Sequence, residues 1–434
     1  MNPVRFCLLV LIAILVTATV ALAGGFQLNE VGARAMGMGG AFAAQANDLT
    51  ALYFNPAGLA YQKGFGAYLG ATMILPKSSN TVTATGVATD MVSQTFFPPN
   101  AYFGYGFDNG LAVAVGVFSP FGLGTEWPAT WSGRYFAVKA DLQAFMVNPT
   151  IAYKINEYLM VGAGVSWMYS KVKFNYNIAT YSALLPGPPY VVPSATDGTV
   201  TLDANGNAFS FDVGAIARPI PALSIGVSYR HTTKTDLSGD ATFSSMQVLA
   251  PFFPGGTGAA TIKFPNQIFA GIAYNINDNL TLEFDYQWVG WSSYDSLIVQ
   301  IPTGPVAPLP APLGGPRPLQ TSSRSEKAWN DTYLLRFGGE YRMREWSFRL
   351  GFIYDATPQP NKTVEPLLPD ANRVEGTVGV GYKFDRHWSV DVAYQFISFS
   401  DRTVTGTATG DLNKFPGSYK NSANLIGLSV GFAM

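Results

Sequence analysis

The chain has 434 residues, of which 14% are aromatic and only 13% are charged, about half the roughly 25% of an ordinary soluble domain. Its 27 basic and 28 acidic residues leave a formal net charge of −1, so no basic excess is available to neutralise the phosphates of a nucleic acid. Abundant aromatic residues and low net charge exclude a disordered chain.

The first 23 residues form a predicted secretory signal peptide. Arg5 is followed by an apolar run over residues 6–16 and then by the small-x-small sequence Ala21–Ala23, which are the features of a cleaved leader. The apolar run is shorter than the roughly 20 residues that a membrane-spanning helix needs. Cys7, within this leader, is the only cysteine of the chain. The mature protein is therefore expected to have no thiol, disulfide or thiolate metal site.

Residues 24–60 are rich in glycine and alanine and do not alternate like a strand. Small residues allow close packing against a wall, so the segment fits either a flexible N-terminal arm or a plug. The tripeptide Asn55, Pro56 and Ala57 favours the plug. Proline fixes its own φ angle and holds the preceding residue extended, which makes the tripeptide a rigid corner. We expect an N-terminal hatch over residues 24–60.

The rest of the chain, residues 61–434, alternates with a period of two. Between Leu280 and Trp288, large apolar residues occupy every second position and smaller or polar residues lie between them. A soluble β-sandwich would show the same alternation. Aromatic residues at strand ends, short turns that alternate with long loops, and the signal peptide favour an outer-membrane barrel instead. A sheet can cross hydrocarbon only when it closes and leaves no edge.

We predict an all-β fold, a 14-stranded antiparallel transmembrane β-barrel with the hatch in its lumen. The strands are expected near residues 63–75, 96–107, 111–119, 139–154, 158–176, 206–218, 223–236, 261–276, 280–297, 328–343, 346–356, 370–384, 388–402 and 418–432. An even number of strands places both barrel ends on the periplasmic side. The long loops are then extracellular, centred on residues 76–95, 120–138, 177–205, 237–260, 298–327, 357–369 and 403–417.

Several motifs, in the same order along the chain, resemble those of the FadL family of outer-membrane long-chain fatty acid transporters. They are Gly25–Glu30, Asn55–Ala57, Asn148–Tyr153, Trp288–Ser292, Asp331–Tyr333, Arg336–Tyr341 and Leu368–Arg373. The resemblance implies a 14-stranded barrel plugged by an N-terminal hatch, with a lateral opening where one strand kinks inward and the Asn-Pro-Ala corner resting near that kink.

The third predicted strand and its exit match the kinked strand of that family. Pro120 has no N–H to donate to a neighbouring strand, and Gly122 weakens strand structure, so a local break there is physically reasonable. Phe118 directly precedes the break. We therefore assign the gate to the tripeptide and to this exit: Asn55, Pro56, Ala57, Phe118, Pro120 and Gly122.

Two of the predicted extracellular loops, 177–205 and 237–260, are apolar, whereas the mouth of an open diffusion pore would be polar. An exposed apolar cluster indicates a docking groove. The alternative is that these side chains pack on each other or lie in the lipid of the outer leaflet. With the resemblance, a capture site for a hydrophobic ligand is the better interpretation. Its expected residues are Leu184, Leu185, Val248, Leu249, Phe252 and Phe253.

Charged residues on the inward faces have two interpretations. Opposite charges on adjacent strands can pair and stiffen the wall, or a cation can receive a fatty carboxylate through charge-assisted hydrogen bonds. Lys173, with its neighbour Lys171, and Arg324 or Lys327 lie near the predicted mouth and are the candidates for the second role. The resemblance supports them by region and not residue by residue, so an uncharged hydrocarbon ligand stays open.

Enzyme activity is not expected. Gly427–Gly431 matches the G-x-S-x-G pattern, but a nucleophile elbow needs a sharp strand-to-helix turn, and Ser429 lies in the middle of a predicted strand. His231 and His387 have no visible catalytic partners. No catalytic residue, cofactor or metal site is therefore assigned.

The sequence thus predicts a monomeric outer-membrane protein of a Gram-negative cell. We expect it to take up hydrophobic solutes passively, by capture in the loop groove, hatch-gated passage and lateral exit at the strand kink. Its expected partners are a hydrophobic small molecule, either a fatty acid or a hydrocarbon, and outer-membrane lipid. An aromatic-hydrocarbon channel of the same family is the first alternative. A general diffusion porin, a surface adhesin and an outer-membrane hydrolase are further ones.

Overall fold

The computed structural model describes residues 24–184, 191–231, 233–300, 322–405 and 415–434. The predicted signal peptide lies outside these ranges. In the described part of the chain, no helix is both long enough and apolar enough to cross a membrane.

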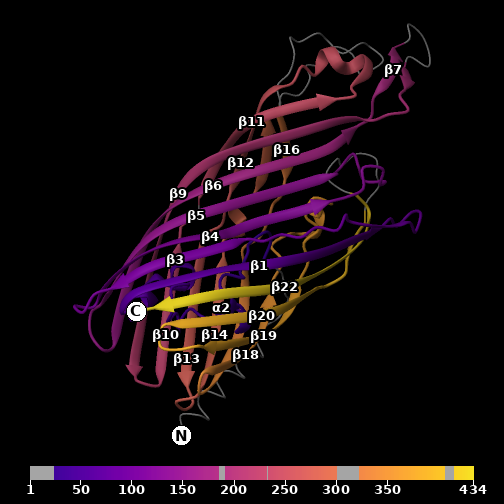
Figure 1. The fold of residues 1–434 in the computed structure, drawn as a ribbon. Helices are drawn as coiled ribbons and strands as arrows, with labels where there is room; N and C mark the ends of the chain where they lie inside the picture. The colour runs from indigo at the N-terminus through magenta and orange to yellow at the C-terminus, as the bar shows by residue number, and fades with distance from the viewer. Residues whose placement is uncertain (1–23, 185–190, 232, 301–321, 406–414) are drawn as a thin grey trace.

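Fourteen antiparallel strands close into one barrel, as the alternation predicts. Ten of the fourteen barrel strands are uninterrupted: β1 (Gly64–Thr81), β3 (Pro99–Gly106), β4 (Leu111–Glu126), β5 (Lys139–Lys154), β6 (Leu159–Ile178), β9 (Gly198–Ile220), β18 (Trp346–Asp355), β19 (Arg373–Lys383), β20 (Trp388–Phe399) and β22 (Gly417–Ala433). Figure 1 shows β22 lying along β1, where pairs from Gly66 with Ala433 to Thr81 with Ser418 close the ring.

The remaining four strands are each interrupted once, at neighbouring places in the wall. They are β10 (Leu223–Arg230) with β11 (Lys234–Ser244), β12 (Gly256–Lys263) with β13 (Gln267–Asn275), β14 (Leu280–Val289) with β15 (Ser296–Gln300), and β16 (Ser322–Glu326) with β17 (Thr332–Met343). The outer halves pair with each other, β11 with β12, β12 with β15 and β15 with β16. The inner halves pair in the same order, β10 with β13, β13 with β14 and β14 with β17, so the breaks lie side by side. We call this line the crease.

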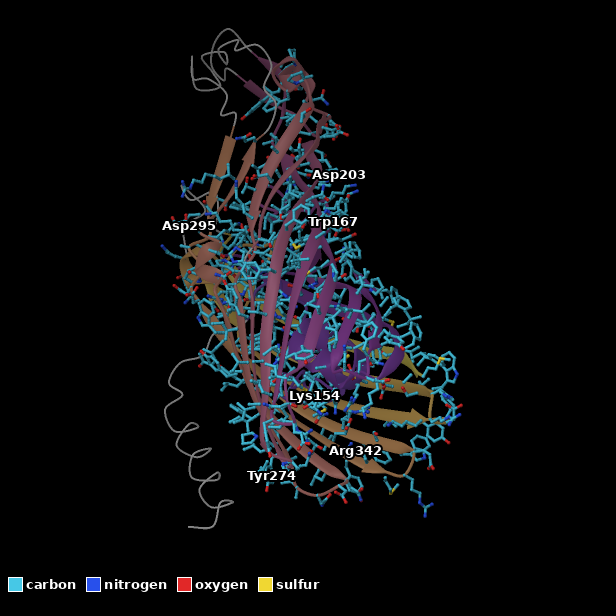
Figure 2. The ribbon with its side chains drawn as sticks, turned by 90° about the vertical axis from the view of Figure 1, so that its left-hand side faces the viewer. Lys154, Trp167, Asp203, Tyr274, Asp295 and Arg342 are labelled. Carbon is cyan, nitrogen blue, oxygen red and sulfur yellow. The ribbon has the colours of Figure 1, made fainter. Side chains whose placement is uncertain are left out.

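The strands carry their large apolar side chains on the outside. Along β14, Glu283 and Asp285 are at most 1% exposed, whereas Tyr286, the residue after Asp285, is 40% exposed. The same inversion continues around the barrel and leaves an apolar outer belt with a buried polar lumen. In Figure 2, Trp167 lies on the outer wall, with Asp203 above it and Lys154 toward the opposite end. This arrangement is that of a membrane barrel.

Short turns join the strands at one end of the barrel and longer connections join them at the other, and we call these the turn end and the loop end. At the loop end, the strands reach further than predicted. The predicted loops at 177–205 and 237–260 are shorter than expected, because β9 begins at Gly198, β11 runs to Ser244 and β12 starts at Gly256. Small elements occupy what remains: β2 (Ala88–Asp90), β7 (Tyr181–Leu184), β8 (Val191–Pro193), η2 (Gln247–Phe252), η5 (Asn361–Thr363) and β21 (Arg402–Val404). One more, η3 (Trp291–Ser293), lies in the crease between β14 and β15.

Residues 24–63, the N-terminal segment, run inside the barrel. They contain three short helices, α2 (Ala33–Gly37), α3 (Ala51–Phe54) and η1 (Pro56–Tyr61). Figure 1 shows α2 within the ring of strands. Most side chains from Phe26 to Leu59 are buried against the lumen wall. The main cluster of buried apolar residues is therefore shared between this segment and the inward faces of the strands.

Candidate functional site

Inward carboxylates on β14 hold the backbone of the N-terminal segment. Asp285 accepts hydrogen bonds from the N–H groups of Phe42 and Ala43, at 2.8 and 2.9 Å. Glu283 accepts one from the N–H of Ala44 at 2.7 Å. Buried N–H groups need partners, and charged acceptors bind them more strongly than neutral ones. These two residues therefore fix the middle of the segment to the wall.

A second charged network joins the segment to neighbouring strands. Arg349 on β18 contacts Glu340 on β17 and Asp391 on β20, both at 2.7 Å. Arg34, from α2, reaches the same Glu340 at 3.0 Å and Asp48 at 3.1 Å. The predicted pairing of opposite charges on adjacent strands is confirmed. The sequence did not reveal that the N-terminal segment takes part in it.

The Asn55 corner packs against the wall formed by β6 and β9. The side-chain amide of Asn55 donates to the carbonyl oxygens of Ala43 and Ala215, at 2.9 and 3.1 Å. Its side-chain oxygen accepts from the N–H of Ala57 at 3.1 Å. A Cβ on Gly162 would lie 2.4 Å from the carbonyl carbon of Pro56, so only glycine permits this approach.

The predicted break in the third strand is confirmed. Phe118 pairs with Met146, but the next pair joins Phe121 to Ala144, so β4 contains one residue more than β5 between these pairs. Pro120 lies in this bulge, as expected from its missing N–H. The regular pairing of β4 with β3 ends at Val117, below the bulge.

The residues that pair with the bulge come from the start of the N-terminal segment. The N–H of Leu28 donates to the carbonyl oxygen of Pro120 at 2.9 Å, and the N–H of Gly122 donates to that of Phe26 at 3.0 Å. Gln27 lies opposite Phe121 between these bonds. The kink itself is therefore occupied by residues 26–28, whereas the Asn55–Ala57 corner contacts β6 and β9.

A cavity of about 370 Å³ lies beside the bulge, where β4 has separated from β3. Its inner end is formed by buried residues of the lumen, including Gln27 and Asp370, and its outer end by exposed residues, including Lys77 and Phe97. Most of the lining between these ends is apolar, with Leu28, Ile74, Phe96, Phe121, Leu123 and Phe145. The cavity thus runs from the lumen toward the lipid-facing side of the wall.

Charged groups at the inner end of this cavity are paired within the protein. Arg373 contacts Asp370 at 2.9 Å and Asp355 at 3.6 Å. Burial raises the pKa of the Glu30 carboxyl, which outweighs the opposing effects of its backbone hydrogen bonds and of Arg373. The inner end is therefore polar but holds little uncompensated charge.

Phe26 is surrounded by aromatic rings that come from four barrel strands, β4 and three of the interrupted strands. Its ring centre lies 4.6 Å from that of Trp291 and between 5.5 and 6.1 Å from those of the other members. We call this set the aromatic cage: Phe121, Phe264, Trp291, Tyr294 and Trp329. Four of its members lie in the crease, where the chain leaves the strand and turns inward. The sequence predicts no role for the cage, although Trp291 lies in a motif that resembles the FadL family.

The predicted capture residues gather around the tip of the loop end, in and near β7 and η2. Leu249 is buried and Val248 is half-buried. Phe253 packs on Phe243 with 5.1 Å between ring centres. Leu184 ends β7, Leu185 lies outside the described residues, and the side chain of Phe252 is not described. The described residues therefore support, in part, the alternative that these loops pack on each other.

None of the three predicted carboxylate-binding cations is free to face the lumen. Lys173 shares the outward side of β6 with Trp167 and is exposed. Arg324 pairs with Asp295 at 3.1 Å on the surface. Lys327 is buried, but it forms an ion pair with Glu365. Their predicted role is not supported by these positions.

Ser429 and His231, which were considered for catalysis, make hydrogen-bonding and packing contacts within the barrel. The hydroxyl of Ser429 accepts a hydrogen bond from the N–H of Ala33 at 3.0 Å and so holds α2. His231 lies on the outer wall, with its ring stacked on that of Phe211 at 4.9 Å. Within the described ranges, no group of three or more His, Cys, Asp or Glu residues is arranged to hold a metal ion.

Comparisons with known proteins agree with this architecture. Residues 14–434 match the sequence profile of the family described as outer membrane protein transport protein (OMPP1/FadL/TodX). The long-chain fatty acid transport protein of Salmonella typhi is 24% identical, over 89% of this chain and 90% of that protein.

Two solved structures share the fold. A FadL homologue from Pseudomonas aeruginosa is 19% identical, with a TM-score of 0.79 over 94% of this chain and 100% of that one. The toluene transporter TbuX of Ralstonia pickettii is 21% identical, with a TM-score of 0.68 over 93% of this chain and 99% of that one.

Proposed function

Because this chain belongs to the OMPP1/FadL/TodX family of outer membrane transport proteins, we propose that it carries long-chain fatty acids or related lipophilic compounds passively from the cell surface into the outer membrane. The family consists of transport channels for hydrophobic compounds and not of enzymes, and the barrel is an outer-membrane protein. The finer assignments of solute and route are our proposal.

The observation that carries the proposal is the cavity beside the β4 bulge. It joins the lumen to the outer wall at a place where β4 has lost its neighbour β3 on one side, and its lining is mostly apolar. An apolar solute gains roughly 25 cal/mol for each Å² of its surface that leaves water. A route that ends in the bilayer spares the solute a return to water in the periplasm.

The proposed route has three steps. Solute first partitions into the apolar loop end and then enters the lumen. Residues 26–28 must next leave the bulge. Their two backbone hydrogen bonds and the Phe26 ring lie between the lumen and the place where β4 has separated from β3. Solute then passes the bulge sideways into the acyl chains. The gradient of solute is sufficient to drive this sequence, so no energy source is required.

A reversible cross-link tests whether residues 26–28 move. Gln27 and Phe121 form a narrow antiparallel pair, flanked by the two hydrogen bonds, in which Cα atoms lie about 4.5 Å apart, within disulfide range. We expect the oxidised Q27C/F121C protein to lose most uptake of radiolabelled palmitate and the reduced form of the same protein to regain it. Uptake is measured in cells that lack their own fatty acid transporter.

A second cross-link serves as the control. A Cβ on Gly427 of β22 would lie 3.5 Å from the Cβ of Ala33 in α2, which suits a disulfide. Oxidised A33C/G427C should keep its uptake, because α2 stays in place in the proposed route. Uptake that survives in oxidised Q27C/F121C would contradict gating by residues 26–28. Loss in oxidised A33C/G427C would place the movement in α2 instead.

A channel for uncharged hydrocarbons is the second candidate function. It is favoured by the aromatic cage around Phe26 and by the pairing or outward position of Lys173, Arg324 and Lys327, since a hydrocarbon needs no cation. Uptake of a neutral and an acidic probe by the wild-type protein distinguishes the two candidates.

A further inference from the structure

One cation lies at the outer end of the cavity, at the edge of the apolar belt. The outward face of β1 carries Leu69, Met73 and Leu75 before it reaches Lys77. Lys77 is therefore the first charged residue above the belt on this strand. It also lines the cavity, together with the exposed Phe97. A solute that leaves sideways passes this ammonium group where hydrocarbon meets the polar surface.

Lys77 differs from Arg373, the other cation of the described cavity lining, in having no charged partner in the described part of the chain. No carboxylate of those residues lies within 4.0 Å of its ammonium group, whereas Arg373 at the inner end is paired with Asp370 at 2.9 Å. Asp141 lines the same outer end from β5 and accepts a hydrogen bond from the side chain of Gln143 at 3.2 Å. Lys77 thus presents its ammonium group at the exit without an ion pair to a described residue.

We propose that Lys77 receives the carboxylate of an acyl acid as its tail passes from the cavity into the bilayer. This inference rests on the proposed function and adds a residue that distinguishes an acidic solute from a neutral one. An ammonium group binds a carboxylate through charge-assisted hydrogen bonds. A flexible lysine can keep its charge in the polar zone while its methylene stem lies along apolar surface.

The position matches the shape of such a solute. Phe97 and Phe145 flank the outer part of the cavity and provide apolar contact for a tail. The tail and head of an acyl acid separate at the boundary between hydrocarbon and water, which is the level of Lys77. A neutral solute of equal length gains nothing from this charge. Lys77 is therefore a specificity residue for the anionic head and leaves the apolar path unaffected.

The test compares two probes of one chain length, palmitate and hexadecanol, in cells that lack their own fatty acid transporter. We expect K77Q to lower the initial rate of palmitate uptake about two- to fivefold, the range for one exposed ion pair, and to leave hexadecanol uptake unchanged. K77R should restore palmitate uptake. The amount of folded barrel in the outer membrane, read from heat-modifiable mobility on a gel, normalises each rate.

Lys420 provides a matched control. It points outward from the adjacent β22, opposite Ser79, and is not part of the cavity lining. K420Q should change neither rate. Equal losses of both probes in K77Q, or an equal loss of palmitate uptake in K420Q, would overturn the proposal. If the wild-type protein takes up hexadecanol but not palmitate, the role of Lys77 is overturned and the proposed function stands. If it takes up neither probe, the role of Lys77 and the proposed function are both overturned.

Discussion

At the scale of single residues, the N-terminal segment is held by carboxylates that bind its backbone. Asp285 accepts hydrogen bonds from two of its N–H groups, and Glu283 accepts from two more, those of Ala44 and Gln45. Such anchoring is strong, because an unsatisfied buried N–H costs about 1–3 kcal/mol. It is also local, so the middle of the segment can stay fixed while residues 26–28 leave the bulge.

We predict that D285N loosens the segment. Both N–H donors bind the same carboxylate oxygen, and an amide oxygen in its place carries no charge. Charge-assisted hydrogen bonds are stronger than neutral ones, so we expect a loss of about 1–3 kcal/mol in the binding of the segment to the wall. Single-channel recordings in planar bilayers should show a larger and noisier conductance than the wild-type protein gives.

The control for this variant is D236N. Asp236 is an exposed acid on β11 that contacts Lys234 at 2.9 Å, away from the N-terminal segment. Its conductance should equal that of the wild-type protein. A D285N channel as quiet as the wild type would show that the carboxylate is not what holds the segment.

Among the candidate residues, the alternation could have placed Lys173 correctly. Lys173 has the same parity as Trp167 on its strand, and that parity marks the lipid-facing side. The partners of Arg324 and Lys327 could not be predicted in this way. Glu365 is remote from Lys327 in the sequence, and only the closed barrel brings the two together.

At the scale of elements, the β4 bulge separates two parts of one strand that differ in their pairing. Below it, β4 pairs with both neighbours and completes the wall. Above it, β4 keeps β5 and loses β3. Gly124 lies in the upper part, where a Cβ would come within 1.9 Å of the Phe96 ring. The opening therefore depends on one additional residue and on close packing beside it.

Deleting Pro120 should remove the bulge. The two strands would then have equal numbers of residues between the Phe118 and Phe121 pairs, so β4 could continue its register with β5 without a bend. We expect palmitate uptake to fall to the level of cells without the protein, while the barrel keeps its heat-modifiable mobility on a gel.

Deletion of Gly86 is the matched control. It lies near the loop end between β1 and β2, where a Cβ would have no neighbour within 4 Å. This variant should keep its uptake. A barrel without Pro120 that still transports palmitate would exclude the bulge as the exit.

The sequence predicted the existence of the strands better than their limits. Residues 198–205 read as a loop because Thr199, Thr201, Asp203 and Asn205 are polar at the outward positions. Above the belt, however, a strand faces water, so polar outward residues are expected there. The crease was missed for another reason. The backbone leaves the strand at Trp291 because aromatic partners from other strands converge on Phe26, and a single strand does not show this.

At the scale of the whole molecule, stability depends on the inverted faces. Leu350 is 67% exposed near the middle of β18, where we expect it to face acyl chains. We expect L350R to destabilise the barrel by about 2–4 kcal/mol and S398R, near the polar edge, by about 0–1 kcal/mol, following the depth dependence of lipid-facing charges. Guanidinium titration of protein folded into liposomes measures both. Equal costs at the two positions would contradict the assigned belt.

The ring closes only when β22 reaches β1, and this has a consequence for biosynthesis. A chain translated as far as β20 has two open edges, and in lipid each exposed backbone group on such an edge costs several kcal/mol. Insertion can therefore finish only after residues 417–433 have left the ribosome and crossed into the periplasm. Until then, the nascent polypeptide must be escorted unfolded. A nonsense mutation ahead of Gly417 should leave a product that proteases clear, and not a smaller working pore.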